Sequence, residues 1–142
     1  MTISEKKENF EFWLMDMDAA IDSFISRISL EDKSKLDFSI DSLCTIENWI
    51  LQNYSSSDEV KNMSNSQMVD GAARYIGETF RKILGGKWFI DYSDKDNVFF
   101  GLPQLKDMKN QKAQICPLTL VSASASRRKG NFLINILRSH LK

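Results

Sequence analysis

The spacing of the apolar residues in this 142-residue chain changes at the glycine pair Gly85-Gly86. Before the pair, apolar side chains recur every three or four residues, which is the spacing of one face of an α-helix. After it come two short segments rich in aromatic and β-branched residues, a composition typical of β-strands. Separate runs of helices and strands predict an α+β fold in which helices dominate.

The first helix is expected over residues 2–28. Its start is marked by Thr2 and Glu5, which have the separation of a capping box. Its apolar positions follow helical spacing and are Phe10, Trp13, Leu14, Met17, Ile21, Phe24, Ile25 and Ile28. Acidic residues fall between these positions, so we expect a buried stripe on one side and a negative outer face on the other.

Two more helices are expected before the glycine pair. One runs from about residue 30 to residue 53 and has Ser29 as its N-cap. The other covers residues 66–84, and Gly85 suits the left-handed C-cap that ends many helices. The stretch between them, residues 54–66, is polar and rich in serine and asparagine, which predicts a loop.

Beyond the glycine pair, we expect a β-hairpin and two helices. Residues 87–92 and 98–102 have strand composition and are separated by a polar five-residue loop, which predicts the hairpin. A third short strand is compatible with it, because an isolated hairpin is only marginally stable. Residues 106–114 lack periodicity and predict an exposed loop. Pro117 suits the first turn of one C-terminal helix, and Asn131 is the expected N-cap of the other.

Length and composition favour a single globular domain over residues 1–142. Hydrophobic residues make up 42% of the chain and charged residues 27%, which excludes a wholly disordered protein. The two cysteines, Cys44 and Cys116, are too few and too far apart for a disulfide framework or a zinc knuckle. No apolar run approaches the roughly 18–20 residues of a membrane helix, and the N-terminus has no secretory h-region. We therefore expect a cytoplasmic domain without a membrane partner.

The formal net charge is zero, but the charges are unevenly distributed along the chain. Residues 1–70 hold 14 acids and six bases, whereas residues 71–142 hold five acids and 13 bases. Such asymmetry can mark a surface for a charged partner. Alternatively, the two halves fold onto each other and pair their charges. We expect this second arrangement, because nothing marks a domain boundary near residue 70.

The sequence contains no residues with a recognisable catalytic or metal-binding spacing. The one histidine, His140, lies two residues from the C-terminus, and no nucleophile motif accompanies it. One His and two isolated Cys cannot form a closed zinc site. Asp91, Asp94 and Asp96 surround the hairpin loop but lack the spacing of a calcium loop, so we expect a solvated acidic turn. We therefore expect no enzyme, no metal and no cofactor.

Three consecutive cations form a candidate anion-binding site near the end of the first C-terminal helix: Arg127, Arg128 and Lys129. They support an alternative function, a nucleic-acid-associated or regulatory domain that uses the basic C-terminal half. No aromatic residues alternate with these bases, as stacking on single-stranded nucleic acid requires. We therefore expect no nucleic-acid partner and interpret the run as a solvated helix end.

The segment GAARYIGETFRKILGGKWFIDY, residues 71–92, resembles a pattern of small bacterial α+β domains, in which a glycine-containing helix ends in Gly-Gly-Lys-Trp and enters a hairpin. Cys116-Pro117 matches the element that starts their C-terminal helix. These domains are similar to the immunity proteins encoded beside polymorphic and contact-dependent toxins. The resemblance covers about half of the chain, and its most typical positions are Tyr75, Glu78, Arg81 and Trp88. A structural role is expected for these, with Trp88 in the core and Glu78–Arg81 as an ion pair on the helix surface.

The resemblance and the charge distribution together lead to one functional hypothesis. We expect a non-enzymatic protein-binding module, an immunity protein that binds and neutralises a bacterial toxin. Its partner-binding residues are expected among the acids that could meet a basic toxin surface: Glu11, Asp18, Asp22, Asp94 and Asp96. The sequence leaves open whether the chain forms a homo-oligomer.

Overall fold

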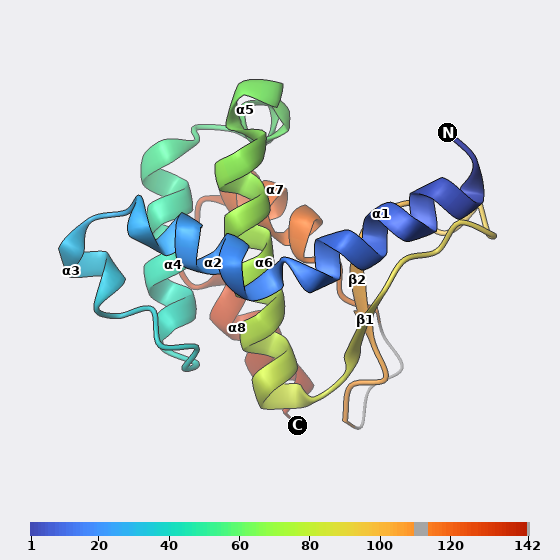
Figure 1. The fold of residues 1–142 in the computed structure, drawn as a ribbon. Helices are drawn as coiled ribbons and strands as arrows, with labels where there is room; N and C mark the ends of the chain where they lie inside the picture. Colours follow the sequence, from blue (N-terminus) through green and yellow to red (C-terminus); the bar gives the residue numbers. More distant parts are fainter. Residues whose placement is uncertain (110–113, 142) are drawn as a thin grey trace.

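The computed structural model describes residues 1–109 and 114–141 and has a helix-dominated α+β fold (Figure 1). In chain order its elements are α1 (Ile3–Met15), α2 (Met17–Ser26), α3 (Leu30–Lys33), α4 (Ser42–Asn53), α5 (Ser57–Lys61), the 3₁₀ helix η1 (Met63–Asn65), α6 (Ser66–Leu84), β1 (Lys87–Phe89), β2 (Gln104–Lys106), α7 (Pro117–Arg127) and α8 (Phe132–His140). The two strands form a small antiparallel sheet. In the described part of the chain, no helix combines the length and apolar character needed to cross a membrane.

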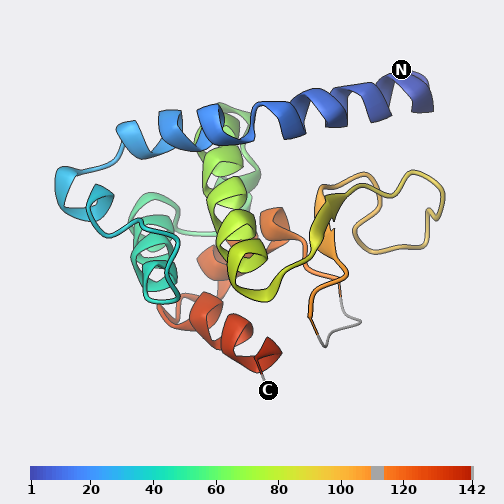
Figure 2. The ribbon, with the colours of Figure 1, turned by 60° about the horizontal axis from the view of Figure 1, so that its bottom comes forward.

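Helix α6 lies at the centre of the molecule, with α2 packed across one side and α7 across another (Figures 1 and 2). The predicted bounds of this helix are confirmed. Every residue from Gly71 to Phe80 is buried, so the helix has neighbours on all sides rather than one apolar face. The largest fully buried apolar side chains come from α4, α6, α7, α8 and β2: Leu43, Ile46, Ile50, Tyr75, Ile76, Phe80, Leu105, Val121, Leu133 and Leu137.

The predicted first helix is divided into α1 and α2, which lie end to end and form the α1–α2 rod across the top of the body in Figure 2. The capping box is confirmed, because Thr2 and Glu5 exchange side-chain and backbone hydrogen bonds. Helical hydrogen bonds continue through the junction, where Asp16 N–H donates to Phe12 O at 3.1 Å and Ala20 N–H donates to Asp16 O at 2.9 Å. The two helices therefore present one nearly continuous outer surface.

The predicted helix over residues 30–53 is wrong, because the structure divides it into the short helix α3 and the longer helix α4. Ser29 does cap α3, since its hydroxyl accepts a hydrogen bond from the Asp32 N–H at 3.2 Å. The interruption lies at Phe38, which has a φ of +63° and donates its N–H to the Tyr75 hydroxyl at 2.9 Å. A tertiary contact with α6 thus breaks a segment whose apolar spacing is helical.

The predicted loop over residues 54–66 is also wrong, because it contains α5 and η1. Polar side chains stabilise these short helices by accepting hydrogen bonds from N–H groups of the first turn. The Ser56 hydroxyl accepts from the Glu59 N–H at 3.3 Å, and the Asn62 side chain accepts from the Ser64 N–H at 2.9 Å. Val60 is buried and anchors α5 on the core.

The predicted hairpin is wrong in its pairing. Residues 98–102 form turns, and β1 pairs instead with β2, in the register Lys87↔Lys106, Trp88↔Leu105 and Phe89↔Gln104. The Asp91 carboxylate accepts from the N–H groups of Ser93 and Asp94, and the Asn97 side chain accepts from the Phe99 N–H at 3.0 Å. These local hydrogen bonds compete with strand pairing and hold the intervening segment as a loop.

One further backbone pairing extends the sheet next to β2. Leu105 forms an isolated antiparallel bridge with Ile115, which takes the place of the suggested third strand. The expected exposed loop over 106–114 is only partly correct. Lys106 belongs to β2 and Met108 is 3% exposed, while residues 110–113 lie outside the described part of the chain.

Both C-terminal helices are confirmed, but their junction differs from the prediction. Helix α7 begins at Pro117 as expected. Its C-cap is Arg128, a non-glycine residue with a φ of +53°. Asn131 precedes α8 but makes no side-chain capping hydrogen bond. The buried carboxylate of Glu47 in α4 caps α8 instead, accepting from the N–H groups of Phe132 and Leu133 at 3.2 and 2.8 Å.

Candidate protein-binding surface

The α1–α2 rod sits on α6 through a close helix crossing. A Cβ atom at Gly71 would lie 2.5 Å from the Cβ atom of Phe24, so only glycine allows the two helices this approach. Gly71 therefore packs within its own chain, against α2, and its neighbours Ala72 and Ala73 are also buried. This contact fixes the position of α2 on the core.

A buried arginine fixes the position of α1. Arg74 is 4% exposed; it donates to the Asp70 carboxylate and to the Trp13 carbonyl, each at 2.7 Å. The Trp13 indole N–H donates to the same carboxylate at 2.9 Å, and the guanidinium carbon lies 4.2 Å from the Trp13 ring centroid. Cation–π contact and charge-assisted hydrogen bonds thus join the end of α1 to α6.

A second charged group lies one helical turn further along α6. Glu78 is 5% exposed and accepts hydrogen bonds from Arg81 Nε at 2.6 Å and from the Trp88 indole N–H at 3.2 Å. Burial raises the pKa of Glu78, but the hydrogen bonds from Arg81 and Trp88 outweigh it, so the net shift is downward. The predicted Glu78–Arg81 pair is confirmed, although Glu78 is buried rather than on the helix surface.

The other positions singled out by the family resemblance also have structural contacts. Trp88 is half-buried, and its ring centroid lies 5.0 Å from that of Trp13 in an edge-to-face contact. The Tyr75 hydroxyl donates to Ser42 Oγ at 2.7 Å. Burial raises the pKa of Tyr75. These residues hold the α1–α2 rod, β1 and α4 against α6 and leave the outer side of the rod open.

The outer side of the rod carries a stripe of exposed side chains at alternating spacings of four and three residues. We call this the outer stripe, and its members are Glu8, Phe12, Met15, Ala19, Asp22 and Ser26. Phe12 is 57% exposed and Met15 is 80% exposed. These two were not among the residues predicted to bind a partner. The sequence does indicate them, because helical spacing places these two large apolar residues on the side of the helix opposite to the buried stripe.

The predicted acids on the rod are all exposed, on neighbouring faces. Glu11 lies on α1, and Asp18 and Asp22 lie on α2. Asp18 and Asp22 also border a pocket of about 240 Å³, whose other lining residues include Glu78 and Lys82 of α6. Part of this acidic surface therefore faces the basic half of the chain across a shallow hollow.

Asp94 and Asp96 occupy a different region. They are exposed in the loop between β1 and β2, which passes beneath the N-terminal half of α1 (Figure 2). The ammonium group of Lys6 lies 5.8 Å from the Tyr92 ring centroid and links this loop to α1. Backbone and side-chain donors of the loop lower the pKa of Asp91 to about 2. The structure thus does not join Asp94 and Asp96 with Asp18 and Asp22 in one patch.

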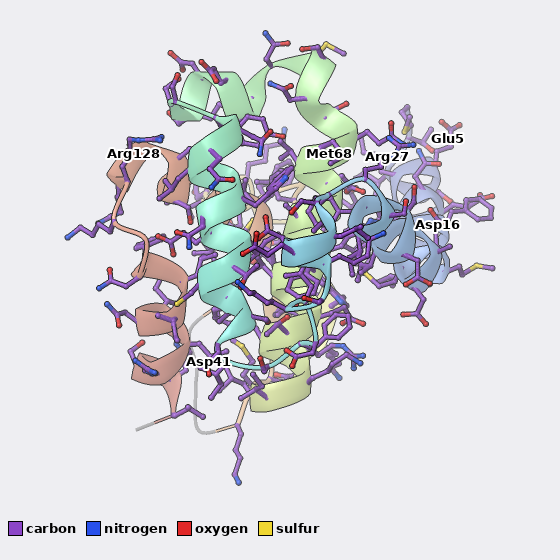
Figure 3. All side chains as sticks on the ribbon, turned by 90° about the vertical axis from the view of Figure 1, so that its left-hand side faces the viewer. Glu5, Asp16, Arg27, Asp41, Met68 and Arg128 are labelled. Atoms are coloured by element: carbon purple, nitrogen blue, oxygen red, sulfur yellow. The ribbon has the colours of Figure 1, made fainter. Side chains whose placement is uncertain are left out.

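The basic run is divided by the fold. Arg128 donates to the carbonyls of Leu51 at 2.7 Å and Tyr54 at 2.8 Å, at the C-terminal end of α4. Figure 3 shows Arg128 at the end of α4 opposite to Asp41. The Arg127 guanidinium lies 5.0 Å from the Phe132 ring centroid, and Lys129 is exposed. An anion at this run would compete with backbone carbonyls for Arg128.

Few of the ion pairs between described residues join the acidic half, residues 1–70, to the basic half, residues 71–142. Among the described residues, four salt bridges occur, and Arg74–Asp70 alone joins the acidic half to the basic half. The remaining three pair residues within one half. The expected internal pairing of the two halves is therefore confined to one buried contact in this part of the chain.

The two thiols lie in surroundings that disfavour their ionised form. Cys116 is 1% exposed and burial raises the pKa of its thiol. Burial also raises the pKa of Cys44, with a further contribution from Glu47. Within residues 1–109 and 114–141, no three His, Cys, Asp or Glu side chains are grouped so that they could hold a metal ion.

Comparisons with protein-family models, with curated proteins and with solved structures give no match for this chain.

Proposed function

We propose that this chain is a non-enzymatic protein-binding module, an immunity protein that binds and neutralises a basic bacterial toxin in the cytoplasm. One observation carries the proposal. Residues 8–26 contain five acids and no Lys or Arg, and all five acids are exposed. None of the five forms an ion pair with another described residue.

The physical mechanism is charge complementarity followed by steric occlusion. A concentrated negative potential accelerates the encounter with a positively charged surface, and a bound domain of this size covers that surface. Nucleases offer such a basic surface, because they bind a polyanion. The rod is held on α6 by the Trp13–Arg74 hydrogen bond and the close contact of Phe24 with Gly71, and a surface already held in place loses less conformational freedom on binding.

The test is capture followed by rescue. The tagged chain is used to capture proteins from its native host, beside a variant in which Glu11, Asp18 and Asp22 are changed to Lys. We expect a stoichiometric basic protein with the unchanged chain and much less of it with the variant. That protein should be toxic when expressed alone and harmless when co-expressed with this chain. A captured protein without toxicity, or toxicity that the chain does not relieve, would contradict the immunity function.

A further inference from the structure

The outer stripe combines exposed apolar side chains with acidic neighbours, and residues 8–26 contain no basic residue. Phe12 and Met15 are adjacent members of the stripe, and Glu8 and Asp22 lie on either side of them along the rod. Two large apolar groups exposed side by side cost free energy in water, and such positions commonly mark protein-binding sites. We propose that the outer stripe binds one basic amphipathic helix of the partner. This inference rests on the proposed function for its biological setting.

The spacing of the stripe fits a helical occupant. Positions separated alternately by four and three residues form a stripe nearly parallel to the helix axis, and in coiled coils the side chains of such a stripe insert between those of a second helix. From Glu8 to Asp22 the stripe extends for about 21 Å at roughly 1.5 Å per residue, the length of about four helical turns. Ala19 is the smallest side chain among the members of the stripe and permits a close approach there.

Charge selects among the possible occupants. Because residues 8–26 carry acids and no bases, the same stripe on a second copy of this chain would meet like charges. Anionic lipid and nucleic acid would be repelled for the same reason. A helix with an apolar stripe flanked by Lys or Arg would cover Phe12 and Met15 and meet the flanking carboxylates. Such a helix would therefore match the stripe both in its apolar residues and in its charge.

The contacts beneath the stripe favour a preformed surface. Arg74 holds the Trp13 carbonyl at 2.7 Å, and Phe24 lies directly against Gly71. Both contacts lie on the side of the rod opposite to the exposed members of the stripe, so binding there need not disturb them. A surface that is already in its bound shape loses less conformational entropy on binding.

The probe is a synthetic Lys/Leu peptide whose leucines fall on one helical face, labelled for fluorescence anisotropy. A second peptide of identical composition has its leucines scattered around the helix. We expect the amphipathic peptide to bind the full chain more tightly, in a salt-dependent manner. The double variant Phe12→Ala/Met15→Ala should weaken its binding about tenfold or more, as expected for central apolar anchors. The matched control Leu30→Ala/Val98→Ala removes two side chains that are each 82% exposed elsewhere and should leave binding unchanged.

Two results would overturn the inference. Equal binding of the two peptides would show attraction by charge alone, and equal binding by the Phe12/Met15 variant and its control would place the apolar contact elsewhere. The experiment needs no toxin, so its outcome is separable from that of the capture test. Specific peptide binding without a rescued toxin would retain the helix-binding surface and reject the immunity function. A rescued toxin without specific peptide binding would retain the immunity function and reject the basic amphipathic helix as the ligand of the stripe.

Discussion

The carboxylate of Glu47 joins two helices that are far apart in the sequence. It lies in α4, is fully buried, and accepts hydrogen bonds from the first two N–H groups of α8. Helix N-termini carry unsatisfied donors and a positive partial charge, so a carboxylate is a favourable cap there. This side chain therefore fixes where α8 begins and how it docks on α4.

Removing this cap should destabilise the fold. Glu47→Ala leaves two buried N–H groups without their acceptor, and we expect the free energy of unfolding to fall by roughly 2 kcal/mol. Glu47→Gln should cost less, because the amide oxygen still accepts one hydrogen bond. Urea unfolding followed by circular dichroism measures both, with the exposed Glu8→Ala as the control. A loss for Glu47→Ala no larger than that of the control would contradict the capping role.

Arg128 makes a comparable link from a more exposed position. Its guanidinium satisfies carbonyl groups at the C-terminal end of α4, where a cation is favoured. We expect Arg128→Ala to lower the free energy of unfolding by about 1 kcal/mol. Arg127→Ala, the adjacent change in the same basic run, should have a much smaller effect. The two variants are compared by thermal unfolding, and equal shifts in melting temperature would refute the assignment.

Sequence reasoning at this scale succeeds for local contacts and fails for distant ones. The Thr2–Glu5 capping box and the Ser29 cap were predictable, because each joins residues three positions apart. Glu47 caps an element 85 positions away, and its own surroundings in the sequence suggest only an apolar helix face. Such a role depends on the tertiary fold and has no local signal.

The position of the α1–α2 rod depends on the close crossing of α2 and α6 at Gly71. Alanine is a better helix former than glycine by about 1 kcal/mol, but at Gly71 its Cβ would overlap Phe24. Because overpacking costs about 1–3 kcal/mol, we expect Gly71→Ala to destabilise the protein despite its higher helix propensity. Gln67→Ala, an exposed change in the same helix, is the control. A Gly71→Ala variant more stable than the unchanged protein would contradict the observed crossing.

The loop between β1 and β2 should respond to acid in a defined range. Hydrogen bonds from Ser93, Asn97 and Asp94 lower the pKa of Asp91 to about 2. Because the folded pKa is depressed, the stabilising effect of the ionised carboxylate is complete above the unfolded pKa of about 3.9 and is lost as the pH falls toward about 2. NMR titration should show the Asp91 carboxyl changing near pH 2. A midpoint near its ordinary value would show that the loop does not hold this geometry.

Elements whose ends are marked by local sequence signals were the most predictable, and those shaped by contacts with distant segments were the least. The bounds of α6 follow from its apolar spacing and the glycine pair after it. Residues 98–102 have strand composition, yet Asp91 and Asn97 turn the chain before they can pair. Phe38 breaks an apparently helical segment because its N–H bonds to Tyr75. Propensity was overridden in both cases by specific hydrogen bonds.

At the scale of the whole molecule, the candidate site was partly predictable. Glu11, Asp18 and Asp22 were expected on an outer face, and the structure leaves them exposed on the rod. Phe12 and Met15 were not predicted as binding residues, because their apolar character alone does not show that they lie opposite to the buried stripe. The separation of Asp94 and Asp96 from the rod acids depends on the path of the loop, which composition does not reveal.

The charge of the rod gives the most direct test of a basic partner. Once the partner has been captured, its association rate is measured by stopped-flow at low and at high ionic strength. Two triple variants are compared with the unchanged chain: Glu11, Asp18 and Asp22 to Lys on the rod, and the exposed Glu31, Asp41 and Asp58 to Lys elsewhere. Both sets change the net charge equally, and circular dichroism checks that each variant remains folded.

The account predicts that the rod variant associates at least about tenfold more slowly at low salt, that the difference shrinks at high salt, and that the second variant is affected far less. Equal slowing of both variants would mean that net charge alone steers the partner. An unchanged association rate for the rod variant would contradict the central claim that the acidic face of the α1–α2 rod is the binding surface.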